Sequence, residues 1–208
     1  MTSEEVDFSS MSAARKPSKT APPTKDRDGF NLIPKTPIYY DLDLTVEYGF
    51  TDITYKVSTR DRCARLAFNR PEVLHAFRPK TINELRKALE NASDDTRVSV
   101  ILLASDIVPE RRTPAFCAGG DQTVRSSKGG YDDGSEDVAR LRVLDLQVQM
   151  RRCPKAIIAI VRGYAIGGGH ILHMMADITL AGEDAVFGQT GPRMGSFDAG
   201  YGSVSMFD

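Results

Sequence analysis

The sequence predicts an α/β protein with parallel strands, and two features of its pattern support this class. Apolar runs of strand length alternate with helical segments, as crossover connections between parallel strands require. Two runs, residues 98–104 and 156–161, are almost continuously apolar, which favours strands buried on both faces. Ligands of such sheets bind beyond the carboxyl ends of the strands, where we expect the glycine-rich stretches "AFCAGGD" and "YAIGGGH".

The first strands and the first helix are predicted from hydrophobic periodicity. Alternating apolar residues predict a strand over residues 53–57, which can pair with a second strand over residues 64–68 across a polar turn. Pro79 opens a helix, because proline is favoured at the first helical position. This helix carries three apolar side chains on one face, namely Ile82, Leu85 and Leu89.

Beyond residue 104, a long polar segment without regular structure is expected to about Ser135. A second helix is predicted over residues 138–152, with three apolar side chains on one face: Leu141, Leu144 and Val148. The strand at 156–161, the glycine run and a third helix follow. Short strands are expected within residues 177–182 and 185–188, and residues 189–208 are expected to form a loop.

The composition of the 208-residue chain is that of an ordinary globular protein, with 41% hydrophobic and 26% charged residues. The net charge of -1 gives no strong attraction to nucleic acid or to an anionic membrane. No apolar run reaches the roughly 18 residues of a membrane helix. The three cysteines are widely spaced, which argues against a disulfide framework or a zinc site and favours a reducing, cytoplasmic location.

Residues 1–48 are predicted to be a disordered extension that precedes one domain over residues 49–208. The extension is rich in Ser, Thr, Pro and charge, so it cannot bury enough apolar surface to offset the entropy of ordering. It lacks the basic-then-apolar order of a secretory signal. Glu4, Glu5 and Asp7 weigh against an organellar transit peptide, but a plastid or peroxisome stays open for a photosynthetic eukaryote.

The two glycine-rich stretches allow three interpretations. A phosphate cradle would use the outward N–H groups of a helix start, but neither G-x-G-x-x-G nor G-x-x-x-x-G-K-[ST] occurs here. An oxyanion hole would use two N–H donors, one from each loop, aimed at one oxygen. A tight joint between a strand and a helix would need only the small size of glycine.

The same motifs resemble the crotonase (enoyl-CoA hydratase/isomerase) superfamily. Within it, "FCAGGDQ", "GGGHILHMMAD" and "FGQTGPRMGSFDAGYGS" are similar to 1,4-dihydroxy-2-naphthoyl-CoA synthases, lyases of menaquinone and phylloquinone biosynthesis. The resemblance runs from about Gly49 to Ser203 and implies a crotonase-like ββα spiral core. Because family members continue with helices and a tryptophan after "GYGS", it also implies a chain that lacks the C-terminal helical part. The family forms trimers or hexamers.

The resemblance implies an intramolecular Claisen ring closure of o-succinylbenzoyl-CoA. The N–H groups of Gly120 and Gly168 would form the oxyanion hole around the thioester oxygen. Tyr131 matches a tyrosine of a mobile loop that contacts the thioester region. Ser196 and Asp198 match a polar pair near the attacked carboxyl group, although such residues in a glycine-rich loop also form ordinary turns.

The choice of reaction depends on two positions. The glutamates of hydratases are matched here by Ile171 and Gly191, and neither side chain can move a proton, so hydration is disfavoured. The resemblance implies that Gly191 marks bicarbonate as the catalytic base, held beside Gln189 and Thr190. The only nucleotide implied is the CoA of the substrate. A non-catalytic crotonase-like fragment and another acyl-CoA hydratase or isomerase stay open as alternatives.

The resemblance also implies contacts to the CoA substrate at three positions: Ala76, Arg125 and Asp121. Two departures put CoA affinity in doubt. Leu74 and His75 stand where the family reads Arg-Asn, and Thr123 stands where a lysine is frequent.

His170 and His173 lie three residues apart on the predicted third helix, so they can share a face. A metal pair would need a third ligand, and no Cys, Glu or His stands at helical spacing nearby. We therefore expect packed, hydrogen-bonded histidines and no metal.

Overall fold

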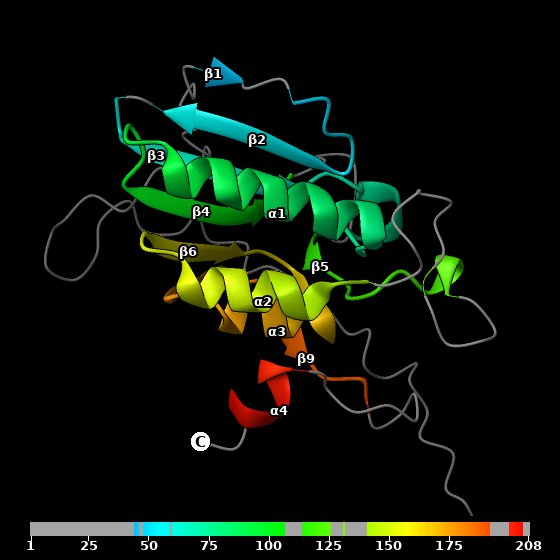
Figure 1. Cartoon of the computed structure of the whole chain (residues 1–208). Helices are drawn as coiled ribbons and strands as arrows, with labels where there is room; N and C mark the ends of the chain where they lie inside the picture. Colours follow the sequence, from blue (N-terminus) through cyan, green and yellow to red (C-terminus); the bar gives the residue numbers. More distant parts are fainter. Residues whose placement is uncertain are drawn as a thin grey trace, which may run out of the picture. The chain divides into compact units, whose positions relative to one another are not determined.

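The computed structural model describes residues 44–45, 48–58, 60–106, 114–125, 131, 141–191 and 200–205, all within one compact unit over residues 40–208. The predicted α/β class is confirmed, and the strands and helices follow a repeating ββα spiral (Figure 1). A larger sheet has the strand order β1 (Leu44–Thr45), β2 (Ile53–Ser58), β3 (Cys63–Phe68), β4 (Val100–Ser105), β6 (Ala156–Val161) and β8 (Ile178–Ala181). A smaller sheet has the order β5 (Ala115–Cys117), β7 (Tyr164–Ile166) and β9 (Val186–Gly188).

The chain builds the two sheets by repeating one path. β4 and β5 precede the helix α2 (Val143–Arg152), and β6 and β7 precede α3 (Gly168–Met174), after which β8 and β9 extend both sheets again. From β3 to β8 every neighbouring pair in the larger sheet is parallel, whereas β1, β2 and β3 pair antiparallel. Because β5, β7 and β9 are parallel neighbours, the loops that follow them leave from the same edge of the smaller sheet.

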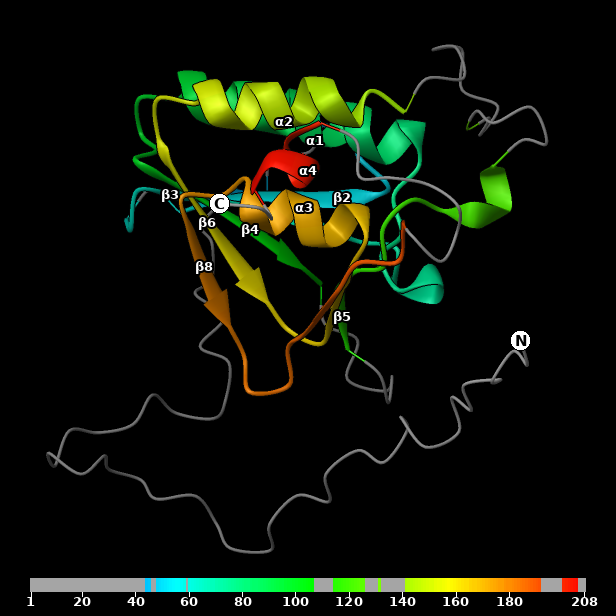
Figure 2. The same cartoon turned by 90° about the horizontal axis from the view of Figure 1, so that it is seen from below.

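One face of the larger sheet is covered by α1 (Pro79–Asp94) and α2, which lie side by side (Figures 1 and 2). The predicted apolar face of α1 is confirmed, since Ile82, Leu85 and Leu89 are at most 2% exposed. They pack in one hydrophobic core with alternate residues of β2, β3, β4 and β6. Within the described residues, no helix is both long enough and apolar enough to cross a bilayer.

One expectation about burial needs correction. In β6, Ile157 and Val161 are buried, but Ile158 and Ile160 are only partly buried, because the two helices cover one face alone. β1 lies within residues 1–48 and pairs antiparallel with β2.

The buried face of α2 differs from the prediction. The segment has two apolar stripes at helical spacing, and the structure buries Leu146 and Met150 while Leu144 is 48% exposed. The helix starts at Val143, because Arg142 adopts a left-handed conformation with φ of 47°.

Several short elements were not predicted. β5 lies in the segment expected to be polar loop, and the short helix α4 (Tyr201–Ser205) lies where a loop was expected. The 3₁₀ turns η2 (Pro71–Val73) and η3 (Gln122–Val124) flank the loops that matter most for the candidate site.

Candidate active site

Two glycine-rich loops meet at one edge of the smaller sheet. The loop over residues 118–121 follows β5, and Gly167 follows β7. Since these strands are parallel neighbours, both loops leave from the same edge. A β-carbon built on Gly119 would lie 2.9 Å from the carbonyl oxygen of Ile166 and 3.3 Å from the nitrogen of Gly168. The structure thus brings the two loops into direct contact.

Phe77, which precedes α1, touches both loops. Its N–H donates to the carbonyl of Gly119 at 2.8 Å, and its carbonyl accepts from the N–H of Asp121 at 2.9 Å. This short parallel bridge between Phe77 and Gly120 does not use the N–H of Gly120. The ring of Phe77 lies against Gly168, where a β-carbon would be only 2.5 Å from Cζ. One residue therefore fixes the position of both glycines.

The glycine triplet serves two purposes. Gly169 packs on β5 so closely that a β-carbon would collide with the carbonyl of Cys117, which is the tight joint considered above. Gly167 precedes the helix with φ of 55°, a conformation that other residues rarely adopt. Gly168 is the first residue of α3, so its N–H has no intrahelical partner.

Tyr131 lies on the other side of the first loop. Its hydroxyl occupies the place to which a β-carbon on Gly120 would point. The Gln122 amide nitrogen donates to the carbonyl of Gly120 at 2.8 Å and reaches the Tyr131 hydroxyl at 3.4 Å. Arg125 donates to the Gln122 side-chain oxygen at 3.2 Å and forms an isolated bridge with Tyr131. These three side chains border the Gly120 side of the candidate site.

Gln189 and Thr190 border the other side. Their side-chain oxygens would lie 3.6 Å and 3.5 Å from a β-carbon built on Gly167. Both polar atoms of the Gln189 amide are buried, and neither has a hydrogen-bond partner among the described residues. Gly191 is buried beside them, and Ile171, at the other glutamate position of hydratases, is 4% exposed in the core.

Asp121 and Ala76 are held by the buried Arg70. One guanidinium nitrogen donates to the carbonyl of Ala76 at 2.6 Å, and another donates to the Asp121 carboxylate at 2.8 Å. The second carboxylate oxygen accepts from the N–H and hydroxyl of Thr123 at 3.0 and 2.6 Å. Burial opposes ionisation of Asp121, but the bonds from Thr123 and Arg70 outweigh it and hold its pKa below the usual range.

The departures at Leu74 and His75 have a clear local structure. Both residues adopt left-handed conformations, with φ of 54° and 58°, and together they turn the chain back toward the first glycine loop. His75 Nδ1 accepts the N–H of Arg70 at 3.1 Å, and the Arg70 carbonyl accepts the N–H of His75 at 2.8 Å. His75 therefore closes the turn that carries Ala76.

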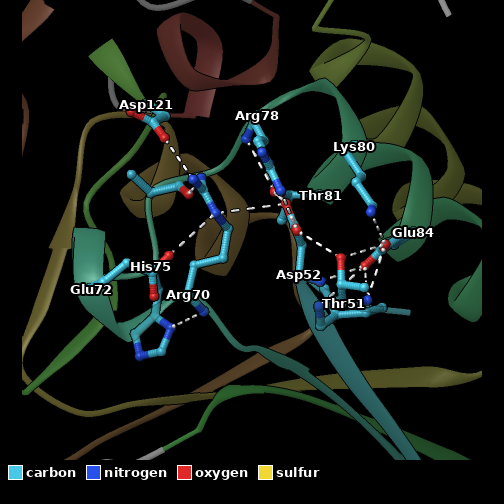
Figure 3. A network of polar contacts seen from close by, with 12 residues as sticks. Thr51, Asp52, Arg70, Glu72, His75, Arg78, Lys80, Thr81, Glu84 and Asp121 are labelled. Carbon is cyan, nitrogen blue, oxygen red and sulfur yellow. Dashed lines mark hydrogen bonds and ion pairs between the residues drawn. The ribbon is translucent and has the colours of Figure 1, made fainter. Parts of the chain in front are cut away.

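A buried polar network lies beside this turn (Figure 3). Asp52 accepts two bonds from Arg78, at 2.7 and 2.8 Å, and one from Thr81 at 2.7 Å. Burial opposes its ionisation, yet these bonds lower the pKa of Asp52 to about 2. Glu84 accepts the N–H groups of Thr51, Asp52 and Ile53, which ties α1 to the start of β2.

The two histidines of α3 pair with each other. His173 Nε2 lies 2.8 Å from His170 Nδ1, and His173 Nδ1 lies 3.1 Å from the Thr179 hydroxyl. The ring of Phe187 packs against that of His173, with 4.7 Å between the two ring centroids. Burial, followed by the neighbouring His170, lowers the pKa of His173 to about 4. Within the described part of the chain, no three potential metal ligands gather, here or elsewhere.

The structure therefore gathers five of the predicted site residues around the contact between the two glycine loops: Gly120, Gly168, Tyr131, Gln189 and Thr190. Ala76 and Asp121 are held next to this contact by Arg70. Ser196 and Asp198 lie outside the described residues. No role was predicted for Arg70 or Phe77. Arg70 stands in "NRPE" (residues 69–72) and Phe77 in "AFRP" (residues 76–79), two stretches within the region of resemblance, and these stretches are the only signal for them in the sequence.

Comparison with known proteins agrees with this architecture. The family model described as enoyl-CoA hydratase/isomerase matches residues 59–207. A solved enoyl-CoA hydratase/isomerase (crotonase) from Legionella pneumophila is 30% identical over 72% of this chain, with a TM-score of 0.60. An enoyl-CoA hydratase/isomerase from Xanthobacter autotrophicus is 27% identical over 70%, with a TM-score of 0.58. A protein described as an enoyl-CoA hydratase from Mycobacterium smegmatis is 34% identical over 67%, with a TM-score of 0.54.

The matched part covers 54%, 51% and 52% of these three proteins, so the chain spans about half of their length. The family model matches more than half of the chain, and the two contacting glycine loops lie inside the matched region. This chain therefore belongs to the enoyl-CoA hydratase/isomerase (crotonase) family.

Proposed function

We propose that this protein closes the second ring of o-succinylbenzoyl-CoA, as a 1,4-dihydroxy-2-naphthoyl-CoA synthase. The observation that carries the proposal is the pair of replaced glutamates. Ile171 is buried in the core and Gly191 has no side chain, so neither can add water to an enoyl-CoA. The subfamily motifs around Gln189 support ring closure instead.

The chain's own groups have definite roles in this reaction. The N–H groups of Gly120 and Gly168 bind the thioester oxygen, so that charge is stabilised there when a proton leaves the adjacent carbon. That carbon then bonds to the aromatic carboxyl carbon, and one water is lost. The Tyr131 hydroxyl, next to Gly120, orients the thioester.

The residues beside Gly167 fit a bound bicarbonate. The Gln189 amide offers a buried donor and a buried acceptor that find no partner in the described part of the chain, which suits an anion that carries both oxygens and an O–H. Thr190 adds a hydroxyl at the same place, and Gly191 contributes no side chain there. When bound, bicarbonate supplies the base for this reaction.

Enoyl-CoA hydration or isomerisation is the second candidate, because the solved relatives are described as hydratases and isomerases. A mass measurement separates ring closure from hydration, and a changed chromatographic retention at constant mass would mark isomerisation. We would incubate the protein with o-succinylbenzoyl-CoA in bicarbonate buffer and, separately, with crotonyl-CoA, and analyse the thioesters by liquid chromatography and mass spectrometry. Ring closure removes one water from the first thioester, whereas hydration adds one water to the second. Water gained by crotonyl-CoA, with o-succinylbenzoyl-CoA unchanged, would overturn the proposal.

A further inference from the structure

A buried arginine connects the turn before α1 with the loop that carries Gly120 (Figure 3). The side chain of Arg70 is 11% exposed, and its guanidinium reaches three buried groups as well as the exposed carboxylate of Glu72, which lies 3.9 Å from Nε. It donates to the Ala76 carbonyl at 2.6 Å and to the Asp121 carboxylate at 2.8 Å, and its Nε lies 3.7 Å from Asp52. A planar guanidinium presents its donors in a fixed fork, so it sets the spacing of the groups that it binds.

The two groups held by this fork flank the bridge between Phe77 and Gly120. Ala76 directly precedes Phe77, and Asp121 directly follows Gly120. The Arg70 guanidinium therefore binds one residue next to each partner of the bridge, Ala76 beside Phe77 and Asp121 beside Gly120. Movement of Asp121 would shift the Gly120 carbonyl, with which it shares a planar peptide bond. Through the Cα of Gly120, the same movement would turn the preceding peptide, which carries the Gly120 N–H.

Arg70 is itself fixed by neighbouring residues. The main chain of Arg70 exchanges two hydrogen bonds with His75, at 3.1 and 2.8 Å. Asp52, behind the guanidinium, is fixed by Arg78 and Thr81. Arg70 thus links a rigid network under α1 to the loop of the candidate site.

We infer that Arg70 is a positioning residue for the oxyanion hole, which sets the place of the Gly120 N–H through Asp121. The inference rests on the role proposed above for Gly120. A reacting group that is misplaced by about 1 Å can cost roughly 100-fold in rate, so a small shift of this loop is sufficient for a large effect.

The test uses Arg70→Lys, which keeps the charge but loses the fork, and Asp121→Asn, which keeps the shape but loses the charge. Arg65→Lys is a matched control. Arg65 also forms an ion pair, with Asp106 at 2.7 Å, and also donates to a carbonyl, that of Ser105 at 3.1 Å, but it lies in β3 and contacts neither glycine loop. Circular dichroism and thermal unfolding check that each variant is folded.

Two readouts separate positioning from stability. The first is the split between kcat and KM for ring closure. The second is the ¹³C chemical shift of bound benzoyl-CoA labelled at its carbonyl, which reports polarisation of the thioester without any reaction. We expect Arg70→Lys to lower kcat by about 10- to 100-fold with little change in KM, and to reduce the downfield carbonyl shift. Arg65→Lys should lower only the unfolding temperature.

A folded Arg70→Lys protein with the wild-type kcat and carbonyl shift would overturn the inference. If that variant does not fold, the same comparison with Asp121→Asn decides the question. A wild-type protein that polarises benzoyl-CoA but does not close o-succinylbenzoyl-CoA would refute the proposed reaction alone, and the shift in the variants would still test Arg70. A wild-type protein that binds benzoyl-CoA without a carbonyl shift would overturn the inference itself.

Discussion

The ring of Phe77 occupies the space into which a side chain on Gly168 would project. A β-carbon on Gly168 would lie 2.5 Å from Cζ and 2.9 Å from Cε1 of that ring, and Phe77 is only 2% exposed. Because the main chain of Phe77 also bridges Gly120, a displaced ring would disturb both proposed oxyanion donors. The contact therefore couples packing to the geometry of the site.

Substitution of Gly168 by alanine tests this coupling. We expect Gly168→Ala to lower the free energy of unfolding by about 1–3 kcal/mol through overpacking, and to lower kcat for ring closure by about 10-fold or more. Urea denaturation and steady-state kinetics measure the two effects. The double variant Gly168→Ala/Phe77→Leu removes the colliding ring atoms, so it should recover part of both losses. No recovery in the double variant would show that the Phe77 contact is not the cause.

Gln189 should show opposite effects on stability and on activity. Its two buried polar atoms have no hydrogen-bond partner among the residues that the structure describes, and such a group costs about 1–3 kcal/mol. In bicarbonate-free buffer we therefore expect Gln189→Met to raise the free energy of unfolding by about 1 kcal/mol, while ring closure is lost. Added bicarbonate should stabilise the wild type but not the variant. A variant less stable than wild type without bicarbonate would contradict the proposed site.

Because the pKa of His173 is lowered in the folded chain, we predict that the free energy of unfolding decreases in mild acid. Its pKa is about 4 in the folded chain and 6.5 without perturbation, so between these values protons bind the unfolded chain preferentially. Stability should be unaffected above pH 6.5 and fall as the pH decreases toward 4, by at most about 3 kcal/mol. His173→Gln should remove this part of the pH dependence. Parallel pH curves for the two proteins, measured by urea denaturation, would refute the prediction.

Because the pKa of Asp52 is also lowered, we predict a second decrease in the free energy of unfolding at lower pH. Its folded pKa of about 2 lies below the ordinary 3.8, so its contribution is complete above pH 3.8 and is lost as the pH falls toward 2. At pH 7, Asp52→Asn should lower the free energy of unfolding by about 2 kcal/mol. The difference from wild type should shrink between pH 4 and pH 2. A difference that is constant over this range would contradict the assigned protonation.

The sequence was sufficient for the strands and helices with strong periodicity. β2, β3 and α1 were predicted because their apolar residues recur at the spacing of one buried face, and β4 was predicted from its almost continuous apolar run. β5 and β7 were missed, since three residues are too few for a period to be visible. In α2 two apolar stripes compete, and only packing against α1 and the sheet selects the one with Leu146 and Met150.

The candidate site shows the same limit. Gly120, Gly168, Tyr131 and Gln189 were predicted from family motifs, which mark positions without showing contacts. Arg70 had no visible role, because its partners are distant in sequence and meet it only when the turn before α1 folds onto the first glycine loop. Only in that arrangement does the Arg70 guanidinium bind Ala76 and Asp121 together.

The most direct test of the proposed function is the bicarbonate dependence of ring closure. Formation of the naphthoyl product from o-succinylbenzoyl-CoA would be followed by absorbance in carbonate-free buffer, with bicarbonate added in steps at constant ionic strength. We predict negligible turnover without bicarbonate, a saturable rise on its addition, and weaker dependence in Gly191→Asp, which supplies a carboxylate at the same position. A wild-type rate that does not respond to bicarbonate would contradict the account.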